Sequence, residues 1–189
     1  SDDQAVQWFD LAGIGRAPAR LDLKKLDHLT ALHFSAMNDA AVLHELEAFL
    51  AVTGADLLTG AQRNGLLAAM PQLKDKARNF GQILERGHFV LISRPVVPDE
   101  KAAKALDSVS RSILSELTPQ LQNASWERER LEAIVSEIAA RHGLGLGKIA
   151  PALRAALAGR SVSPSVFDMM LVLGRDETLA RLTEAASGS

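Results

Sequence analysis

Apolar side chains recur every three or four residues through most of the sequence, the spacing that gathers them on one face of an α-helix. Two such stripes cover residues 23–32 and 42–50. Asp22 stands directly before the first stripe, where an aspartate caps a helix start, and Gly54 follows the second, where a glycine ends a helix. These patterns predict two amphipathic helices in the first third of the chain.

Two shorter apolar stretches accompany these helices. A short helix is predicted to begin at Ser1 and to carry Val6 and Phe9. The run 89–92 is the only strand-like one, but four apolar residues followed by Pro95 can equally finish a helix and enter a loop. Both alternatives stay open for this run.

Five further helices are predicted in the second half of the chain. They extend from a cap at Asp99 to before Pro119, from Ser125 to Gly143, through Ile149, Leu153 and Leu157 to Gly159, from the Ser163–Pro164 pair to Gly174, and through Leu179 and Leu182. Because helical spacing dominates throughout, we predict an all-α fold built as a helical bundle.

The composition narrows the class of protein. Of the 189 residues 47% are hydrophobic and none is cysteine, which excludes a disulfide scaffold, a thiolate zinc site and a thiol nucleophile. No apolar run approaches the 18 residues of a membrane span, and the acidic start at residues 1–3 is unlike a basic secretory signal. We therefore expect a cytoplasmic protein that does not contact a membrane.

Charge is distributed unevenly along the chain, although the total is only −2. The net charge is +4 over residues 63–94, the first basic island, and +4 over residues 141–167, the second basic island. If the fold brings them together, the two islands would form a face for a polyanion. The alternative is that their cations decorate solvated helix faces, and charge alone favours that alternative.

The sequence carries no pattern typical of catalysis or metal binding. His28 and His33 are five residues apart, which places them on different faces of a helix, and no H-E-x-x-H motif occurs. The glycine-rich run 143–148 lacks the Ser or Thr of a phosphate-binding loop and is predicted to be a helix end, a turn and a new helix start. We expect no metal, no cofactor and no catalytic residue in a helical binding module.

Short motifs near the start and in the last third point to a family. Residues 144–159 (LGLGKIAPALRAALAG), 163–167 (SPSVF) and 171–174 (LVLG) follow one another, and residues 18–26 read PARLDLKKL. These runs resemble K-L-G-x-x-A-x-P-L-R-x-A-L-T-G, S-P-x-L-F, L-L-G-x-E and P-A-x-F-D-x-x-K-L of bacterial glutamyl-tRNA synthetases. The blocks keep the family's order, so the resemblance covers nearly the whole chain.

The resemblance implies only part of such an enzyme, since the H-x-G-H and K-[LM]-S-K motifs of the family's catalytic domain do not occur here. It implies a helical stem-contact region over residues 1–50 and two helical anticodon-binding subdomains over residues 51–118 and 119–189. ATP and Mg would be bound by the catalytic domain of the parent enzyme, and the 189 residues alone are expected to be inactive. The expected partner is tRNA rather than DNA, bound by a monomer.

The resemblance also assigns tRNA contacts to individual residues. Anticodon contacts fall on Ser163, Pro164 and Val166 and on Arg154, whose guanidinium can stack on a base or bond to its edge. Contacts to the tRNA backbone, which add affinity without base specificity, are expected at four further cations: Lys24, Lys25, Lys148 and Arg160.

One assignment concerns the choice between two tRNAs. An arginine of the family that reads the third anticodon base aligns with Lys76, with Arg78 as the alternative. Because lysine lacks the planar, two-pronged donor of arginine, we expect relaxed discrimination between tRNA-Glu and tRNA-Gln, or a preference for tRNA-Gln.

A rival hypothesis belongs to a different class. The chain could be a helical protein–protein interaction module whose basic faces meet an acidic partner. RNA binding through several phosphates falls steeply with salt, whereas a hydrophobic groove hardly responds, so salt dependence separates the two hypotheses.

Overall fold

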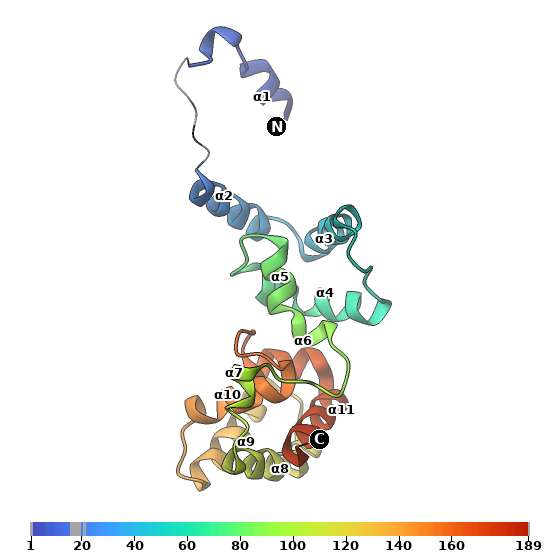
Figure 1. The fold of residues 1–189 in the computed structure, drawn as a ribbon, viewed down its shortest axis with the longest axis vertical. Coiled ribbons are helices and arrows are strands. Elements are labelled where there is room, and N and C mark those ends of the chain that lie inside the picture. The colour runs from blue at the N-terminus through green and yellow to red at the C-terminus, as the bar shows by residue number, and fades with distance from the viewer. Residues whose placement is uncertain (1, 16–19, 21, 189) are drawn as a thin grey trace.

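The computed structural model describes residues 2–15, 20 and 22–188, and within these ranges it consists of helices and loops with no strand (Figure 1). The prediction of an all-α fold is confirmed. The expected helix start at Ser1 and positions 18, 19 and 21 of the N-terminal motif lie outside the described residues. In chain order the helices are α1 (Asp2–Trp8), the 3-10 helix η1 (Leu11–Gly13), α2 (Leu23–Ala36), α3 (Asp39–Thr53), α4 (Gly60–Lys74), α5 (Phe80–Arg86), α6 (His88–Leu91), α7 (Glu100–Ala103), α8 (Ser108–Gln122), α9 (Arg128–Arg141), α10 (Leu146–Ala158) and α11 (Val166–Ser187).

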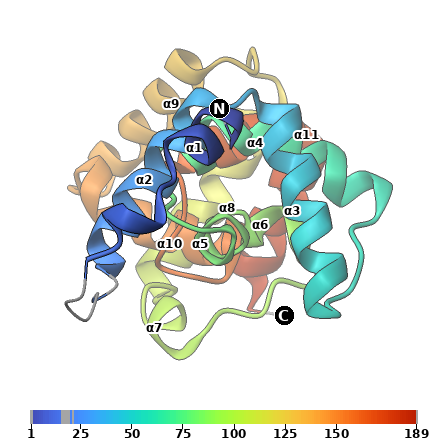
Figure 2. The ribbon, with the colours of Figure 1, turned by 90° about the horizontal axis from the view of Figure 1, so that it is seen from above.

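The helices follow one another along the long axis of the molecule (Figure 1). α1 and α2 lie at one end, α3 to α6 in the middle, and α7 to α11 at the other end. Seen along that axis, α2 and α3 lie over opposite sides of the molecule (Figure 2). α11 packs on α8 and α10 and also reaches α4, so it joins the middle of the molecule to its C-terminal end.

Most of the predicted apolar stripes form the core, but Val6 and Phe9 near the start of the chain are exposed, and Phe9 lies just after the end of α1. Leu43 and Leu46 of α3, Ile138 of α9 and Leu153 of α10 are buried in a single hydrophobic cluster. The stripe at residues 23–32 in α2 differs, because its leucines are exposed. Amphipathic spacing therefore predicted this helix but not its burial.

Local capping explains where several helices begin and end. The Asp22 carboxylate accepts hydrogen bonds from the backbone N–H groups of Lys24 and Lys25 at 3.0 and 3.2 Å, as predicted for a helix cap. Gly54 and Gly159 end α3 and α10 with φ of 68° and 64°, in the left-handed region that favours glycine. These three cap predictions are confirmed. Each cap depends on residues close by in the sequence, which is why the sequence could predict it.

The single long helix predicted after Asp99 is wrong. Asp99 caps only the four residues of α7, and a second cap at Asp107 starts α8, where its carboxylate accepts from the N–H of Ser110 at 2.7 Å. α8 then continues through Pro119 to Gln122, although we expected it to end earlier. Burial of leucines on both sides of the proline, at positions 117 and 121, keeps the helix intact.

Two other predicted starts are displaced along the chain. The helix expected at Ser125 begins at Arg128, and the helix expected at Ser163 begins at Val166. Ser163 does not cap it, because its hydroxyl donates to the carbonyl oxygen of Pro164 at 3.1 Å. The predicted break at Gly174 is confirmed, since φ is 75° and ψ is 175° there, within α11.

The apolar run 89–92 is not a strand. Residues 89–91 belong to α6, and Ile92 ends that helix, so the helix-to-loop alternative holds. None of the described helices is long and apolar enough to cross a membrane.

Candidate nucleic-acid interface

Half of the cations in the first basic island (residues 63–94) are bound by acidic side chains outside it. These ion pairs join Arg63 to Glu47 (2.8 Å), Lys74 to Asp39 (2.9 Å), and Arg94 to Glu177 and Glu184 (3.1 and 2.8 Å). In the second basic island (residues 141–167), Arg141 binds Glu116 at 2.5 Å. These cations link helices to one another, so their charge is largely neutralised within the protein.

The other six cations of the islands form no ion pair or side-chain hydrogen bond with any residue that the structure describes. We call them the free cations: Lys76, Arg78, Arg86, Lys148, Arg154 and Arg160. Five of them are residues that the sequence motifs assigned to tRNA, and the exception is Arg86. The Nε atom of Arg86 is buried without a hydrogen-bond partner. Folding thus separates the cations of each island into two sets. The paired cations join helices to one another, and the free cations, the available set, have no acidic partner and can bind a ligand.

Part of the available set meets in one hollow of about 450 Å³ between α2 and the loop after α4. Lys24 and His28 line it from α2, and Lys76 and Arg78 line it from the loop. Lys24 and Lys76 are 52 residues apart in the sequence, and the fold brings them to one site. His28 is a member that sequence reasoning assigned no role.

The loop that carries Lys76 and Arg78 is held by contacts on both sides. The ammonium group of Lys74 donates to the carbonyl oxygen of Met37 at 2.6 Å, which ties the end of α4 to the end of α2. The backbone N–H of Arg78 donates to the Gln82 Oε1 atom at 2.8 Å. The loop is therefore positioned by backbone contacts that leave both cationic side chains available.

The second group of free cations lies on α10 and just beyond it. Arg154 is half-buried on α10, whereas Lys148 in its first turn and Arg160 after its end are exposed. Gly145 precedes the helix without a side-chain cap, and no acidic residue occurs in the first turn. Unsatisfied N–H groups and a nearby lysine make this helix start favourable for an anion.

The loop between α10 and α11 differs in detail from the sequence expectation. Pro164 is buried and Val166 is only 3% exposed, so neither side chain offers an open surface on which a base could stack. Val162, at 51%, is the exposed apolar residue of this loop. Ser165 precedes α11 without a side-chain cap bond, which leaves backbone N–H groups as hydrogen-bond donors.

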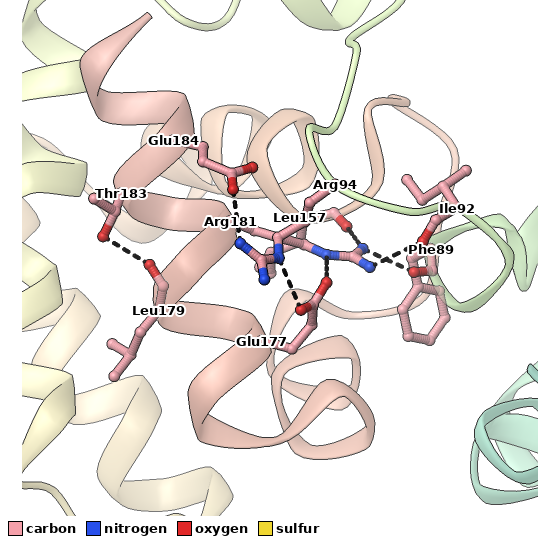
Figure 3. A network of polar contacts seen from close by, with 9 residues as sticks. All are labelled: Phe89, Ile92, Arg94, Leu157, Glu177, Leu179, Arg181, Thr183 and Glu184. Atoms are coloured by element: carbon pink, nitrogen blue, oxygen red, sulfur yellow. Dashed lines mark hydrogen bonds and ion pairs between the residues drawn. The ribbon is translucent and has the colours of Figure 1, made fainter. Parts of the chain in front are cut away.

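Arg181, on α11, binds the C-terminal ends of α6 and α10 (Figure 3). Its guanidinium is 3% exposed and donates to the carbonyl oxygens of Phe89 at 2.8 Å, Leu157 at 2.5 Å and Ile92 at 3.3 Å. Its Nε atom also donates to Glu177 at 2.7 Å. These carbonyls belong to the final residues of α6 and α10 or follow them directly, where the helices leave acceptors unsatisfied.

His88 reports on the electrostatics of the same region. Burial lowers the pKa of the His88 imidazole from its ordinary value near 6.5, and the positive charges of Arg160 and Arg181 lower that pKa further. Arg160, from the loop after α10, therefore lies close enough to His88 in α6 to affect the pKa of that imidazole. This proximity connects the second basic island with the end of the first.

Comparison with known proteins decides the family. A model described as "Anticodon binding domain" matches residues 38–186. The chain belongs to the anticodon-binding domain family. The match begins at the residue before α3, so α1 and α2 precede the matched domain.

Relatives of this anticodon-binding chain are considerably longer. It is 63% identical to "Glutamate--tRNA ligase 1" of Dinoroseobacter shibae and 60% identical to "Glutamate--tRNA ligase 2" of Ruegeria pomeroyi, over 98% of this chain in each case. A crystal structure of a glutamate tRNA ligase from Elizabethkingia meningosepticum is similar over 99% of the chain, with a TM-score of 0.76 and 27% identity. The chain spans about 40% of the length of the two curated relatives and 36% of that solved structure.

No group of three or more His, Asp or Glu side chains among the described residues is placed to hold a metal ion. Sequence reasoning missed three residues of the anticodon-binding chain: His28 in the hollow, Arg86 among the free cations, and Arg181 behind the loops. His28 could have been found from its i, i+4 spacing to Lys24. Arg181 has no comparable signal, because its partners are backbone carbonyls.

Proposed function

We propose that this chain is the tRNA-binding, anticodon-recognising part of a glutamate–tRNA ligase. One observation supports the proposal most strongly: five of the six free cations are residues that the family motifs assign to tRNA. Cations without acidic partners keep their charge for phosphates, which dominate the affinity of nucleic-acid binding. If the chain were a protein–protein interaction module, its unpaired cations would have no reason to fall on the residues that the family motifs assign to tRNA.

The free cations support a division of labour between the two groups. Lys24, Lys76 and Arg78 would bind around the hollow, whereas Arg154 and the loop after α10 would read anticodon bases. Since the side chain of Val166 is buried, we assign base contacts in that loop to backbone donors, the Ser163 hydroxyl and the Arg154 guanidinium. Lys25, Lys148 and Arg160 would contact the tRNA backbone.

Relaxed tRNA choice is part of the proposal. Lys76 can place a charge near a base or phosphate but cannot form the two parallel hydrogen bonds that arginine makes. We therefore propose that the chain binds tRNA-Glu and tRNA-Gln with similar affinity.

The rest of the proposal concerns the parent enzyme. The parent would attach glutamate to tRNA with ATP and Mg held by a catalytic domain, and it would act in the cytoplasm as a monomer. We keep the division into residues 1–50, 51–118 and 119–189, although α3 and α8 continue across the two limits. The limits therefore mark regions of contact with tRNA rather than breaks between helices.

A binding titration tests the proposal. The chain is titrated into labelled tRNA-Glu at several salt concentrations, with a transcript of altered anticodon as the matched control. Four or five phosphate contacts predict a loss of affinity on the order of a hundredfold between about 50 and 200 mM salt. Weak binding that ignores both salt and anticodon would contradict the proposal and favour the protein–protein alternative.

A further inference from the structure

One backbone conformation divides α11 into two parts. Gly174 has φ of 75° and ψ of 175°, a region that almost only glycine adopts. A Cβ atom at this position would meet nothing within 4 Å, so the backbone conformation, and not crowding, favours glycine here. The break separates a first arm, residues 166–173, from a second arm, residues 175–187. The first arm begins directly after the loop to which we assign anticodon contacts.

The segment between α8 and α9 is bound to the first arm by two polar contacts. The indole N–H of Trp126 donates to the carbonyl oxygen of Met170 at 3.1 Å. Arg128, the first residue of α9, forms an ion pair with Asp168. Asp168 lies in the first turn of the arm and Met170 in its last turn, so these contacts hold the arm near both of its ends.

The same segment is also bound to the second arm. The guanidinium of Arg175, directly after the break, donates to the carbonyl oxygens of Gln122 at 2.9 Å and Ala124 at 2.6 Å. Its central carbon lies 5.4 Å from the centroid of the Trp126 ring, within the range of a cation–π contact. Trp126 therefore contacts both arms. We call Trp126, Arg128 and Arg175 the clasp.

The polar contacts of the clasp define the direction of the first arm more sharply than its apolar contacts do. Phe167 and Met169 are buried in the core, but hydrophobic contacts are not directional, whereas hydrogen bonds weaken steeply as their angle changes. At about 1.5 Å per residue the arm is on the order of 12 Å long, so a tilt of about 5° at the break would move its start by about 1 Å. Since N–H···O distances vary over only about 0.5 Å, such a tilt would break a hydrogen bond to a base.

We propose that Trp126 is a positioning residue for anticodon recognition, an inference that rests on the proposed function. Through the Met170 carbonyl, Trp126 fixes the direction of the first arm. The arm in turn places the backbone N–H groups at its start and the Ser163 hydroxyl in the loop before it. Ser165 leaves these N–H groups without a side-chain cap. Trp126 acts through the arm, without touching the tRNA.

Paired titrations of a Trp126 variant test this role. Trp126→Phe removes the indole N–H and keeps an aromatic ring beside Arg175. The affinities for tRNA-Glu and for a transcript with an altered anticodon are measured with the original chain and with the variant. We expect the ratio of the two affinities to fall roughly fivefold or more, in the range of one base contact. The affinity for the altered transcript should be nearly unchanged, because the phosphate contacts remain.

Two further variants separate positioning from stability. Ile138→Val removes a buried methyl group from α9, so it should lower the midpoint of urea unfolding but leave the affinity ratio unchanged. Arg128→Gln, at a side chain that is 40% exposed, removes the other contact of the first arm at little risk to folding and should lower the ratio. A fall of the ratio in Ile138→Val, or an unchanged ratio in both clasp variants, would overturn the inference.

A double-mutant cycle tests the route of the effect. If Trp126 acts through the loop before the first arm, Trp126→Phe should lower the ratio less when Ser163→Ala is already present. Its effect should add to that of Lys76→Ala, which lies at the hollow. Additive effects with both partners would contradict a route through the loop.

The two proposals fail in different ways. Anticodon-dependent binding by the original chain, with the ratio unchanged in Trp126→Phe and Arg128→Gln, would reject only the positioning role. An original chain that binds both transcripts equally would reject anticodon recognition itself, and the positioning role with it.

Discussion

The guanidinium of Arg181 donates a hydrogen bond of 2.8 Å to the carbonyl oxygen of Phe89, a residue 92 positions earlier in the chain. The same Nη1 atom donates to Leu157 at the end of α10. One buried side chain thus fastens α11 to the ends of two helices, and the loop with Arg160 starts two residues after Leu157. The placement of that loop depends on a residue that is itself shielded from solvent.

Replacing this residue should destabilise the protein. Arg181→Leu removes the donors of three carbonyl oxygens and leaves Glu177 without one partner, so we expect a loss of about 3 kcal/mol in the free energy of unfolding. Urea denaturation measures it. Arg94→Gln, which removes a more exposed partner of the same Glu177, is the matched control and should have a much smaller effect. Equal effects of both substitutions would contradict the structural role of Arg181.

Arg154 should matter for binding and not for folding. It has no ion pair or side-chain hydrogen bond among the described residues, so Arg154→Ala should leave the midpoint of urea unfolding nearly unchanged. We expect tRNA-Glu affinity to fall by roughly tenfold or more, and less for a transcript with a mismatched anticodon. Lys101→Ala, at an exposed cation outside both basic islands, is the control. A similar loss of tRNA affinity for Lys101→Ala would mean that the effect of Arg154→Ala comes from removing one positive charge and not from a specific contact.

Position 76 should govern tRNA choice. Lys76→Arg adds the two-pronged donor, and we expect it to raise the ratio of tRNA-Glu to tRNA-Gln affinity by roughly tenfold, in the range of one good bidentate contact. Binding of both transcripts to the original chain and the variant measures the ratio. Strong rejection of tRNA-Gln by the original chain would contradict the proposed relaxed choice, and an effect of Arg78→Lys alone would move the role to Arg78.

The titration of His88 should report on tRNA. Because its pKa is lowered in the folded state by burial, Arg160 and Arg181, protonation opposes folding, and stability should fall as pH drops through 6.5 toward the folded pKa. A tRNA phosphate at Arg160 would offset that charge, so binding should raise the His88 pKa. NMR titration measures the change, with His88→Gln to assign the signal. In Arg160→Ala the pKa should rise without tRNA and change little when tRNA is added.

A pair of glycines tests the close packing at the end of α10. Gly159 and Gly143 both have positive φ, but a Cβ atom at Gly159 would lie 2.8 Å from the carbonyl oxygen of Val97, whereas one at Gly143 would meet nothing within 4 Å. Gly143→Ala should cost about 1 kcal/mol for its backbone conformation, and Gly159→Ala at least about 1 kcal/mol more because of the clash. Thermal unfolding of both variants measures the difference. Equal losses of stability in the two variants would mean that the backbone around Val97 moves away from the added methyl group without a penalty.

Features that depend on near neighbours were the ones that the sequence predicted well. The caps at Asp22, Gly54 and Gly159 each involve residues within five positions. The break before α8 was missed because neither glycine nor proline marks it: α7 ends at Ala103 and Asp107 caps the start of α8 without a change in apolar spacing. The burial of Val166 and the exposure of the α2 leucines depend on distant helices, which local periodicity cannot report.

The candidate site divides in the same way. Motifs identified Lys24, Lys76 and Arg154 one by one, but the hollow that joins the first two depends on the Lys74–Met37 contact between α4 and α2. Charge counting found both basic islands but could not separate free from paired cations, since the acids that neutralise Arg63 and Arg94 lie 16 and more than 80 residues away.

The separation of the basic residues into paired and free sets has an evolutionary consequence. A substitution at Arg94 or Arg141 removes ion pairs between helices, whereas one at Lys76 or Arg154 removes no ion pair or side-chain hydrogen bond among the described residues. Under the proposed function, the residues that bind tRNA can therefore change without a loss of folded protein, because the ion pairs that join the helices are made by other cations.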